Sequence, residues 1–341
     1  MDSRVTSHLD PSGLPDDAHT LPTITELSFA APGVRSLCWD GDELVDWVGG
    51  GQRWTLAGHA LPPVREPEAG FDDAVVLPGS PWAAVFELRG ERGLILRDGQ
   101  PWRELKRAEH VSGCFGYPIV LFRLADGRAV VAHCPEDYCC LQIDDLETGE
   151  TLAACPREDA DDYFPAGLEV SPCGRWLLSG AGWVWHPVSC IRAYDLSAAL
   201  RDPRTLGGVG VPFDGWGDYA DACFLPDSRV LLSVTGTCLD AAERASGTRF
   251  DHELAVIDLD HPDAAQRWDL GDWNGGVMAM GNRHTFTFHD HLRLVAIDGV
   301  REVRSWPHVT FGDGVLALDS ARGRLAQARD GRIAILQLQA V

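Results

Sequence analysis

The sequence contains no long hydrophobic run, and its longest apolar stretches have only the length of a β-strand. A membrane-spanning helix takes roughly 18 or more apolar residues, so we expect no membrane partner. The opening segment, MDSRVTSHLDPSGLPDDAHT, also lacks the apolar core of a secretory signal. Its polar, proline-containing composition predicts a disordered tail over residues 1–20. Together these absences predict a cytoplasmic protein.

Positive charge is scarce. The chain has 29 Lys and Arg residues against 51 Asp and Glu residues, which gives a formal net charge of −22. Such a field repels phosphate backbones and anionic membranes over about one Debye length, roughly 8 Å in physiological salt. We therefore expect no nucleic-acid partner.

No C-x-x-C pair occurs among the ten cysteines, so the usual pattern of a structural zinc site is missing. Several cysteines fall in apolar strands, where a free thiol packs as a small hydrophobe, and this favours a reducing compartment. Cys134, Cys139 and Cys140, with His133 nearby, form the one suggestive group. Cys139 and Cys140 are adjacent in a predicted strand, so their side chains should point to opposite faces. We expect buried thiols and no cofactor.

Recognisable catalytic motifs are absent as well. There is no G-x-S-x-G elbow, no H-E-x-x-H and no Gly-rich dinucleotide loop before a helix. The three glycines at 49–51 are followed by neither a helix nor Lys-Ser/Thr, which excludes a phosphate-binding loop of the nucleotide-hydrolase type. Whether the protein is an enzyme stays open on the sequence alone.

What the sequence does contain is a repeated pattern of short strands, clearest between Leu168 and Leu200. An apolar run from Leu168 is followed by the turn SPCG, a second run over 176–179, a loop, and a third run over 190–194. This cadence resembles the blades of the WD40-like β-propeller superfamily. The Asp usual in that turn is Cys173 here, and the Gly-His and Trp-Asp dipeptides of typical members are absent, so the resemblance implies a fold and no specific function.

Similar units recur along the chain at a mean spacing of about 46 residues, as expected for four-stranded blades. Their first strands are predicted to begin near Ser36, Ala74, Pro118, Leu168, Asp221, Val277 and Val315. We predict one all-β domain over residues 21–341, a closed propeller of seven four-stranded blades, with six or eight as alternatives. The fourth blade would be completed by an outer segment over 204–208. The last blade supplies only three strands, so its fourth should come from the N-terminal segment 24–29.

In such a propeller the loops between second and third strands and the loops between blades emerge on one face. Aromatic and acidic residues are concentrated in these loops, and surfaces of this kind bind peptides, cationic groups or sugars. The predicted ligand-binding residues are Trp183, Trp185, His186, Tyr163, Asp162, Trp216, Asp218, Tyr219, Trp273 and Asp272. The loop from Trp183 to Pro187 could equally be a plug of the channel mouth, because it is too apolar to stand in water without a reason.

Three functions remain open. The leading one is a non-catalytic interaction module that holds a peptide or protein partner on the acidic, aromatic face. The alternative is an enzyme, or a propeller that binds a small molecule or metal, with its site at the channel mouth and with His186, His289 and nearby Asp residues as acid/base or metal-binding groups. His289 and His291 lie on the same side of an extended chain and are the low-ranked metal candidates; hydrogen-bonding loop histidines are commoner. The third is a structural scaffold.

Overall fold

The structure is a computed structural model, and it describes part of the chain. The described residues are 22–67, 69–109, 112–135, 137–184, 188–208, 210, 216–236, 249–271, 275–288, 290–310, 312 and 314–339. The predicted tail over residues 1–20 lies outside these ranges.

Five of the sheets are antiparallel meanders of four consecutive strands. The first three are β2 (Cys38–Asp40), β3 (Glu43–Asp46), β4 (Gln52–Thr55), β5 (Ala60–Leu61); β6 (Asp73–Val76), β7 (Trp82–Phe86), β8 (Arg92–Arg97), β9 (Gln100–Lys106); and β10 (Ile119–Arg123), β11 (Ala129–His133), β12 (Gln142–Asp145), β13 (Thr151–Ala154). The other two are β21 (Tyr219–Phe224), β22 (Val230–Thr235), β23 (His252–Ile257), β24 (Gln266–Asp269); and β25 (Gly276–Met280), β26 (His284–Phe288), β27 (Leu292–Ala296), β28 (Arg301–Trp306).

A sixth sheet joins the two ends of the chain. Its strands are β29 (Val315–Asp319), β30 (Arg324–Arg329), β31 (Arg332–Leu338) and β1 (Ile24–Ala30). The antiparallel register pairs Ile24 with Leu338 and Ala30 with Arg332. The prediction that an N-terminal strand completes the last sheet is confirmed.

The region around the fourth predicted blade departs from the repeat. Its sheet has three strands, β15 (Leu168–Val170), β16 (Trp176–Ser179) and β19 (Arg192–Asp195). In place of a fourth strand come a short helix α1 (Leu196–Arg201) and a 3-10 turn η2 (Pro203–Leu206), so the prediction of an outer strand over 204–208 was wrong. The physical reason is local. The Asp195 carboxylate accepts a hydrogen bond from the Ala198 N–H and caps the helix, which buries Leu196 and Ala199.

An eighth sheet of short strands has no counterpart in the other repeats. It is built from β14 (Tyr163–Phe164), β17 (Trp183–Val184), β18 (Val188–Cys190) and β20 (Trp216–Gly217). We call it the small sheet. The remaining elements are two further 3-10 turns, η1 (Arg157–Asp159) and η3 (Pro262–Ala264). In the part of the chain that the structure describes, no helix is long and apolar enough to span a membrane.

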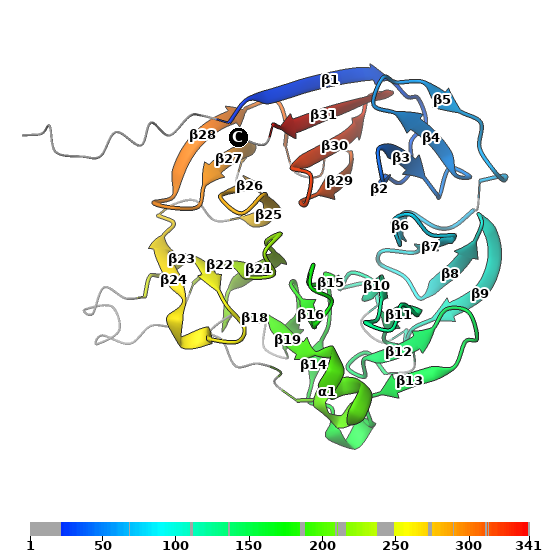
Figure 1. Ribbon diagram of the computed structural model, residues 1–341, viewed down its shortest axis with the longest axis vertical. Helices are drawn as coiled ribbons and strands as arrows, with labels where there is room; N and C mark the ends of the chain where they lie inside the picture. The colour runs from blue at the N-terminus through cyan, green and yellow to red at the C-terminus, as the bar shows by residue number, and fades with distance from the viewer. Residues whose placement is uncertain are drawn as a thin grey trace, which may run out of the picture.

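Figure 1 shows the sheets arranged in a ring, with β2, β6, β10, β15, β21, β25 and β29 toward the centre. The observed first strands are β2, β6, β10, β15, β21, β25 and β29, and each begins within two residues of its predicted start. Side-chain hydrogen bonds link some of these strands directly. The Glu169 carboxylate accepts from the Phe224 N–H of the next sheet, and the Asp221 carboxylate accepts from the Val277 N–H of the sheet after that.

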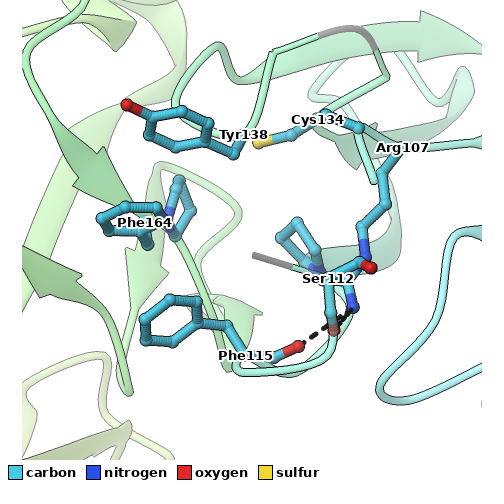
Figure 2. A pocket seen from close by; sticks show the side chains of 9 residues that line it. Arg107, Ser112, Phe115, Cys134, Tyr138 and Phe164 are labelled. Carbon is cyan, nitrogen blue, oxygen red and sulfur yellow. Dashed lines mark hydrogen bonds between the residues drawn. The ribbon is translucent and has the colours of Figure 1, made fainter. Parts of the chain in front are cut away.

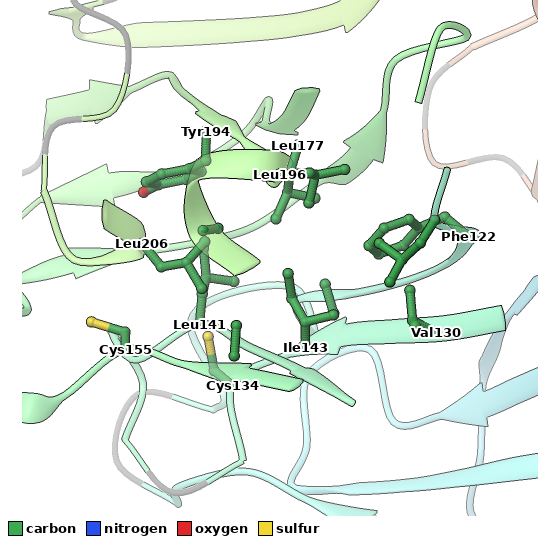
Figure 3. Close-up of a cluster of buried hydrophobic side chains, with 14 residues drawn as sticks. Phe122, Val130, Cys134, Leu141, Ile143, Cys155, Leu177, Tyr194, Leu196 and Leu206 are labelled. Carbon is green, nitrogen blue, oxygen red and sulfur yellow. The ribbon is translucent and has the colours of Figure 1, made fainter. Parts of the chain in front are cut away.

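The hydrophobic core is divided into clusters that each lie between two neighbouring sheets. One of them, in Figure 3, packs Phe122, Val130 and Ile143 of the β10–β13 sheet against Leu177 and Tyr194 of the next sheet. Further clusters join β2–β4 to β29–β31, β2–β3 to β6–β8, β6–β9 to β10–β11, β16 and β19 to β21–β23, β21–β23 to β25, and β25–β28 to β30–β31. The last of these brings the end of the chain against the sheet before it.

Cysteines contribute to the cluster in Figure 3, where Cys134 and Cys155 are buried among apolar side chains. Burial raises the pKa of both thiols, that of Cys155 to about 11. Cys139 and Cys140 precede β12 and lie in a turn, with their sulfurs 4.0 Å apart. The prediction that they point to opposite faces of a strand was therefore wrong, because the strand begins only at Gln142.

Candidate functional site

The small sheet brings together three predicted ligand-binding residues that lie far apart in the sequence. Tyr163 pairs with Val184 and Phe164 with Trp183, while Cys190 pairs with Trp216 on the opposite side of the sheet. Each strand comes from a loop on the predicted face, since β14 and β20 precede innermost strands and β17 and β18 lie between β16 and β19. The small sheet is thus a platform made of loops.

Tyr163 does not reach the surface of this platform. Its side chain is 2% exposed, and its hydroxyl donates to the Ser179 Oγ at 2.7 Å. The Arg192 guanidinium lies over the ring, 4.1 Å from its centroid, and is itself held by both oxygens of Asp161. Burial raises the pKa of the phenol well above its usual value. Tyr163 therefore positions the small sheet with a buried side chain, and its role in ligand binding stays a prediction.

Four aromatic rings form a continuous row across the edge of the platform. The centroids of Tyr138 and Phe164 are 4.4 Å apart and those of Phe164 and Phe115 are 4.8 Å apart, both in stacked geometry. Phe115 continues to Trp183 at 5.8 Å in a tilted arrangement. We call these four residues the aromatic row. None of them is fully buried except Phe164, so part of the row faces solvent.

A narrow pocket opens beside the aromatic row (Figure 2). It is lined by Arg107, Ala108, Ser112, Phe115, Pro118, Cys134, Tyr138, Phe164 and Pro165. Its volume of about 20 Å³ holds little more than one water molecule. A ligand would therefore lie over the rings and insert only a small group between them.

Arg107 organises the loop that carries Phe115. Its side chain is buried, and its guanidinium donates to the backbone carbonyls of Gly90, Ser112, Phe115 and Gly116 at 2.6 to 3.0 Å. The cation also lies 4.8 Å from the centroid of the Tyr117 ring. Burial lowers the pKa of the guanidinium, yet four carbonyl dipoles satisfy its donors. The bonds fix the loop, and through it the place of Phe115 in the row.

Acidic side chains lie at the rim of the aromatic row. Asp162 accepts a hydrogen bond from the Tyr138 hydroxyl at 3.0 Å. Arg157 lies between two acids, 3.7 Å from Asp162 and 3.9 Å from Asp137. Aromatic rings and carboxylates therefore lie side by side at this point.

The other predicted residues are spread over the rest of the loop face. Asp218 is exposed, and Tyr219 is 41% exposed at the start of β21. For Trp216 the structure describes the strand that contains it and not its side chain. Trp185, His186, Asp272, Trp273 and His289 lie outside the described residues.

His291 is described and contacts an acid. Its Nδ1 is 2.8 Å from Asp290, which also accepts a hydrogen bond from Arg293 at 2.7 Å. Within the described ranges, no group of three or more His, Cys, Asp or Glu side chains is placed to hold a metal ion.

Reasoning from the sequence did not select Phe115 or Arg107. Phe115 stands alone in a glycine-containing loop, CFGYP, and its only local signal is that this loop joins two blades. Arg107 follows the outer strand β9 and looks like an ordinary surface cation in the sequence. Both roles depend on how the loops pack against one another, and the spacing of residues along the sequence does not predict that packing.

Comparisons with known proteins identify the fold. No protein-family model and no curated protein matches the sequence. Among solved structures, a chain of the mitotic checkpoint complex matches with a TM-score of 0.60 and 12% identity over 100% of both chains. A chain of Kuenenia stuttgartiensis hydrazine synthase matches with a TM-score of 0.60 and 15% identity, over 96% of this chain and 100% of that one. At these identities the likeness shows the fold alone, which is a β-propeller.

Proposed function

We propose that this β-propeller is a non-catalytic interaction module that holds a peptide or protein partner on its loop face, with the aromatic row as the anchor. The observation that carries the proposal is the row itself, in which Tyr138, Phe164, Phe115 and Trp183 come from four separate segments and stack at one edge of the platform. Partly exposed rings gathered in this way are typical of the residues that dominate binding energy at interfaces.

The charge around the row indicates the chemistry of the partner. Asp137 and Asp162 lie at its rim, and the whole chain has a net charge of −22. A peptide with Lys or Arg beside a small apolar residue fits both features: the net negative charge attracts the cation to a rim where Arg157 already contacts both acids, and the apolar group lies on the rings. One of the solved structures with this fold is a protein complex, which agrees with such a role.

We also propose that the ring has seven blades. The support is that seven sheets supply the innermost strands and that a hydrophobic cluster lies between each neighbouring pair of them. The small sheet is then an elaboration of the loop face and not a blade, because its strands are two or three residues long.

The test uses an array of short synthetic peptides that place Lys or Arg beside Pro, Val or Leu, together with matched peptides in which the cation is Glu. We expect the basic peptides to bind and Phe115→Ala to weaken that binding at least about tenfold, the cost of truncating a central aromatic anchor. Trp102→Ala is the matched control, because Trp102 is 47% exposed on the outer strand β9.

Melting temperatures of both variants separate binding from folding. If Phe115→Ala is destabilised yet binds the basic peptides normally once folded, the aromatic row is a structural plug and the proposal fails. A stoichiometric metal in the purified protein would instead favour an enzyme or metal-binding propeller.

A further inference from the structure

A second cavity is lined by residues of the β25–β28 sheet and of the sheet that contains β1 and β31. Figure 1 shows these two sheets side by side, across the ring from the small sheet. The volume of the cavity is about 310 Å³, at the lower end of the range for small-molecule sites. Its lining is mostly apolar and includes Leu292, Trp306, Val309, Leu325 and Leu336, with His308 beside Val309. We call it the β1–β28 groove.

The strand register places polar residues side by side at the rim of the groove. Ser28 of β1 pairs with Ala334 of β31, which in turn pairs with Gln327 of β30, and all three residues line the groove. Arg332 stands two residues from Ala334 and therefore lies on the same face of β31. Its Nε and Nη2 donate to the Ser28 Oγ at 3.2 and 3.1 Å, so the guanidinium is held at the groove mouth.

Carboxylates near the groove are already paired. Glu26, which lines the groove, accepts hydrogen bonds from Arg304 and from the Trp306 Nε1. Asp330 pairs with Arg329 at 3.1 Å. Arg332 is exposed and, within the described residues, contacts the neutral Ser28 hydroxyl and no carboxylate. The chain has a net charge of −22, so most of its arginines have carboxylates available nearby. Arg332 contacts none, and its guanidinium can therefore bind an anionic ligand at the apolar groove.

We propose that the β1–β28 groove binds an amphipathic monocarboxylate, a small molecule with an aliphatic tail in the groove and its carboxylate on Arg332 and Ser28. The planar guanidinium matches a carboxylate, and charge-assisted bonds of this kind are stronger than neutral ones. Most of the lining is apolar, and its polar members are Glu26, Ser28, His308 and Gln327, so a tail with one charged end fits better than a dianion. This site is separate from the aromatic row and does not depend on the peptide-binding proposal.

The experiment is isothermal titration of the full chain with sodium butanoate and sodium octanoate, below the micelle concentration of the longer acid. Each methylene that enters the groove should tighten binding about fourfold, until the tail is longer than the groove. Octyltrimethylammonium, whose alkyl tail is one carbon longer and whose charge is opposite, should not bind measurably. Equal affinities for octanoate and octyltrimethylammonium, or for octanoate and butanoate, would overturn the proposal.

Variants locate the site. Arg332→Gln should weaken octanoate binding about tenfold or more, since it removes the charge from a charge-assisted pair. Arg301→Gln, which changes an exposed arginine on β28 that does not line the groove, should leave octanoate binding unchanged. Ser28→Ala provides a second, milder variant if Arg332→Gln folds poorly, and it should still cost several-fold. Phe115→Ala should have no effect on octanoate, which keeps the failure of this proposal distinct from that of the peptide site.

Discussion

Single carboxylates near the centre of the ring link neighbouring sheets and make stability depend on pH. Glu169 and Asp221 are half-buried, and burial raises the pKa of each to about 7 although each accepts a backbone hydrogen bond from the next sheet. In the unfolded chain these groups titrate near 4. Between roughly pH 4 and 7 the folded state therefore holds protons that the unfolded state releases.

These two groups should make the free energy of unfolding fall as pH rises from about 4 to 7. The double variant Glu169→Gln, Asp221→Asn keeps an oxygen acceptor for each backbone N–H and removes both ionisations. It should flatten this slope and raise stability by about 1 to 3 kcal/mol at pH 7.5. Urea unfolding at several pH values measures both the slope and the stability, with Asp298→Asn in an exposed turn as the control. An unchanged slope in the double variant would contradict the assignment.

At the scale of an element, helix α1 replaces the outer strand of one blade and depends on its cap. Asp195 accepts from the Ala198 N–H at 2.9 Å and also pairs with Arg175 at 3.1 Å. The cap starts a helix that buries Leu196 and Ala199 against the β10–β13 sheet.

Two substitutions separate the cap from the ion pair. Asp195→Ala should lower the free energy of unfolding by about 1 kcal/mol, the usual cost of losing an N-cap. Asp195→Asn should keep most of that stability, because Asn caps well and the exposed ion pair contributes little. Chemical denaturation of both variants is the measurement. If Asn proves as costly as Ala, the ion pair and not the cap holds the helix.

At the scale of the whole molecule, β1 joins the two ends of the chain. It pairs with β31 along its full length, and Leu27 and Phe29 pack against the cluster between β29–β31 and β2–β4. Without β1 the edge of β31 would be unpaired and this apolar surface exposed.

Truncation tests this closure. A chain that begins at Pro22 is the matched control for one that begins at Ala31, since the two differ only in β1 and the two residues before it. The shorter chain should melt at a clearly lower temperature and aggregate more readily, because an apolar sheet edge is left open. Equal melting temperatures and equal solubility would show that the ring does not depend on this strand.

Much of this fold could be predicted from the sequence because the signals are local. Turns such as Asp98-Gly99 and Asp330-Gly331, where the structure has positive φ at both positions, mark hairpins wherever they occur. Alternating apolar residues between such turns locate the innermost strands. The last predicted blade has only three strands of its own, and the four-stranded repeat therefore predicts a fourth strand from another part of the chain. The helix at Leu196 was missed although Asp195 is a standard cap, because the repeat pattern favoured a strand there.

The candidate sites were decided by tertiary structure. Two-residue strands such as β14 and β17 have no periodicity, so the small sheet exists only because three loops meet on one face. Phe115 joins the aromatic row because Arg107 folds its loop, and the burial of Tyr163 depends on Ser179 and Arg192. The β1–β28 groove arises because two sheets leave space between them. A sequence specifies which residues form each strand, whereas the space between strands far apart in the chain depends on how all the sheets pack.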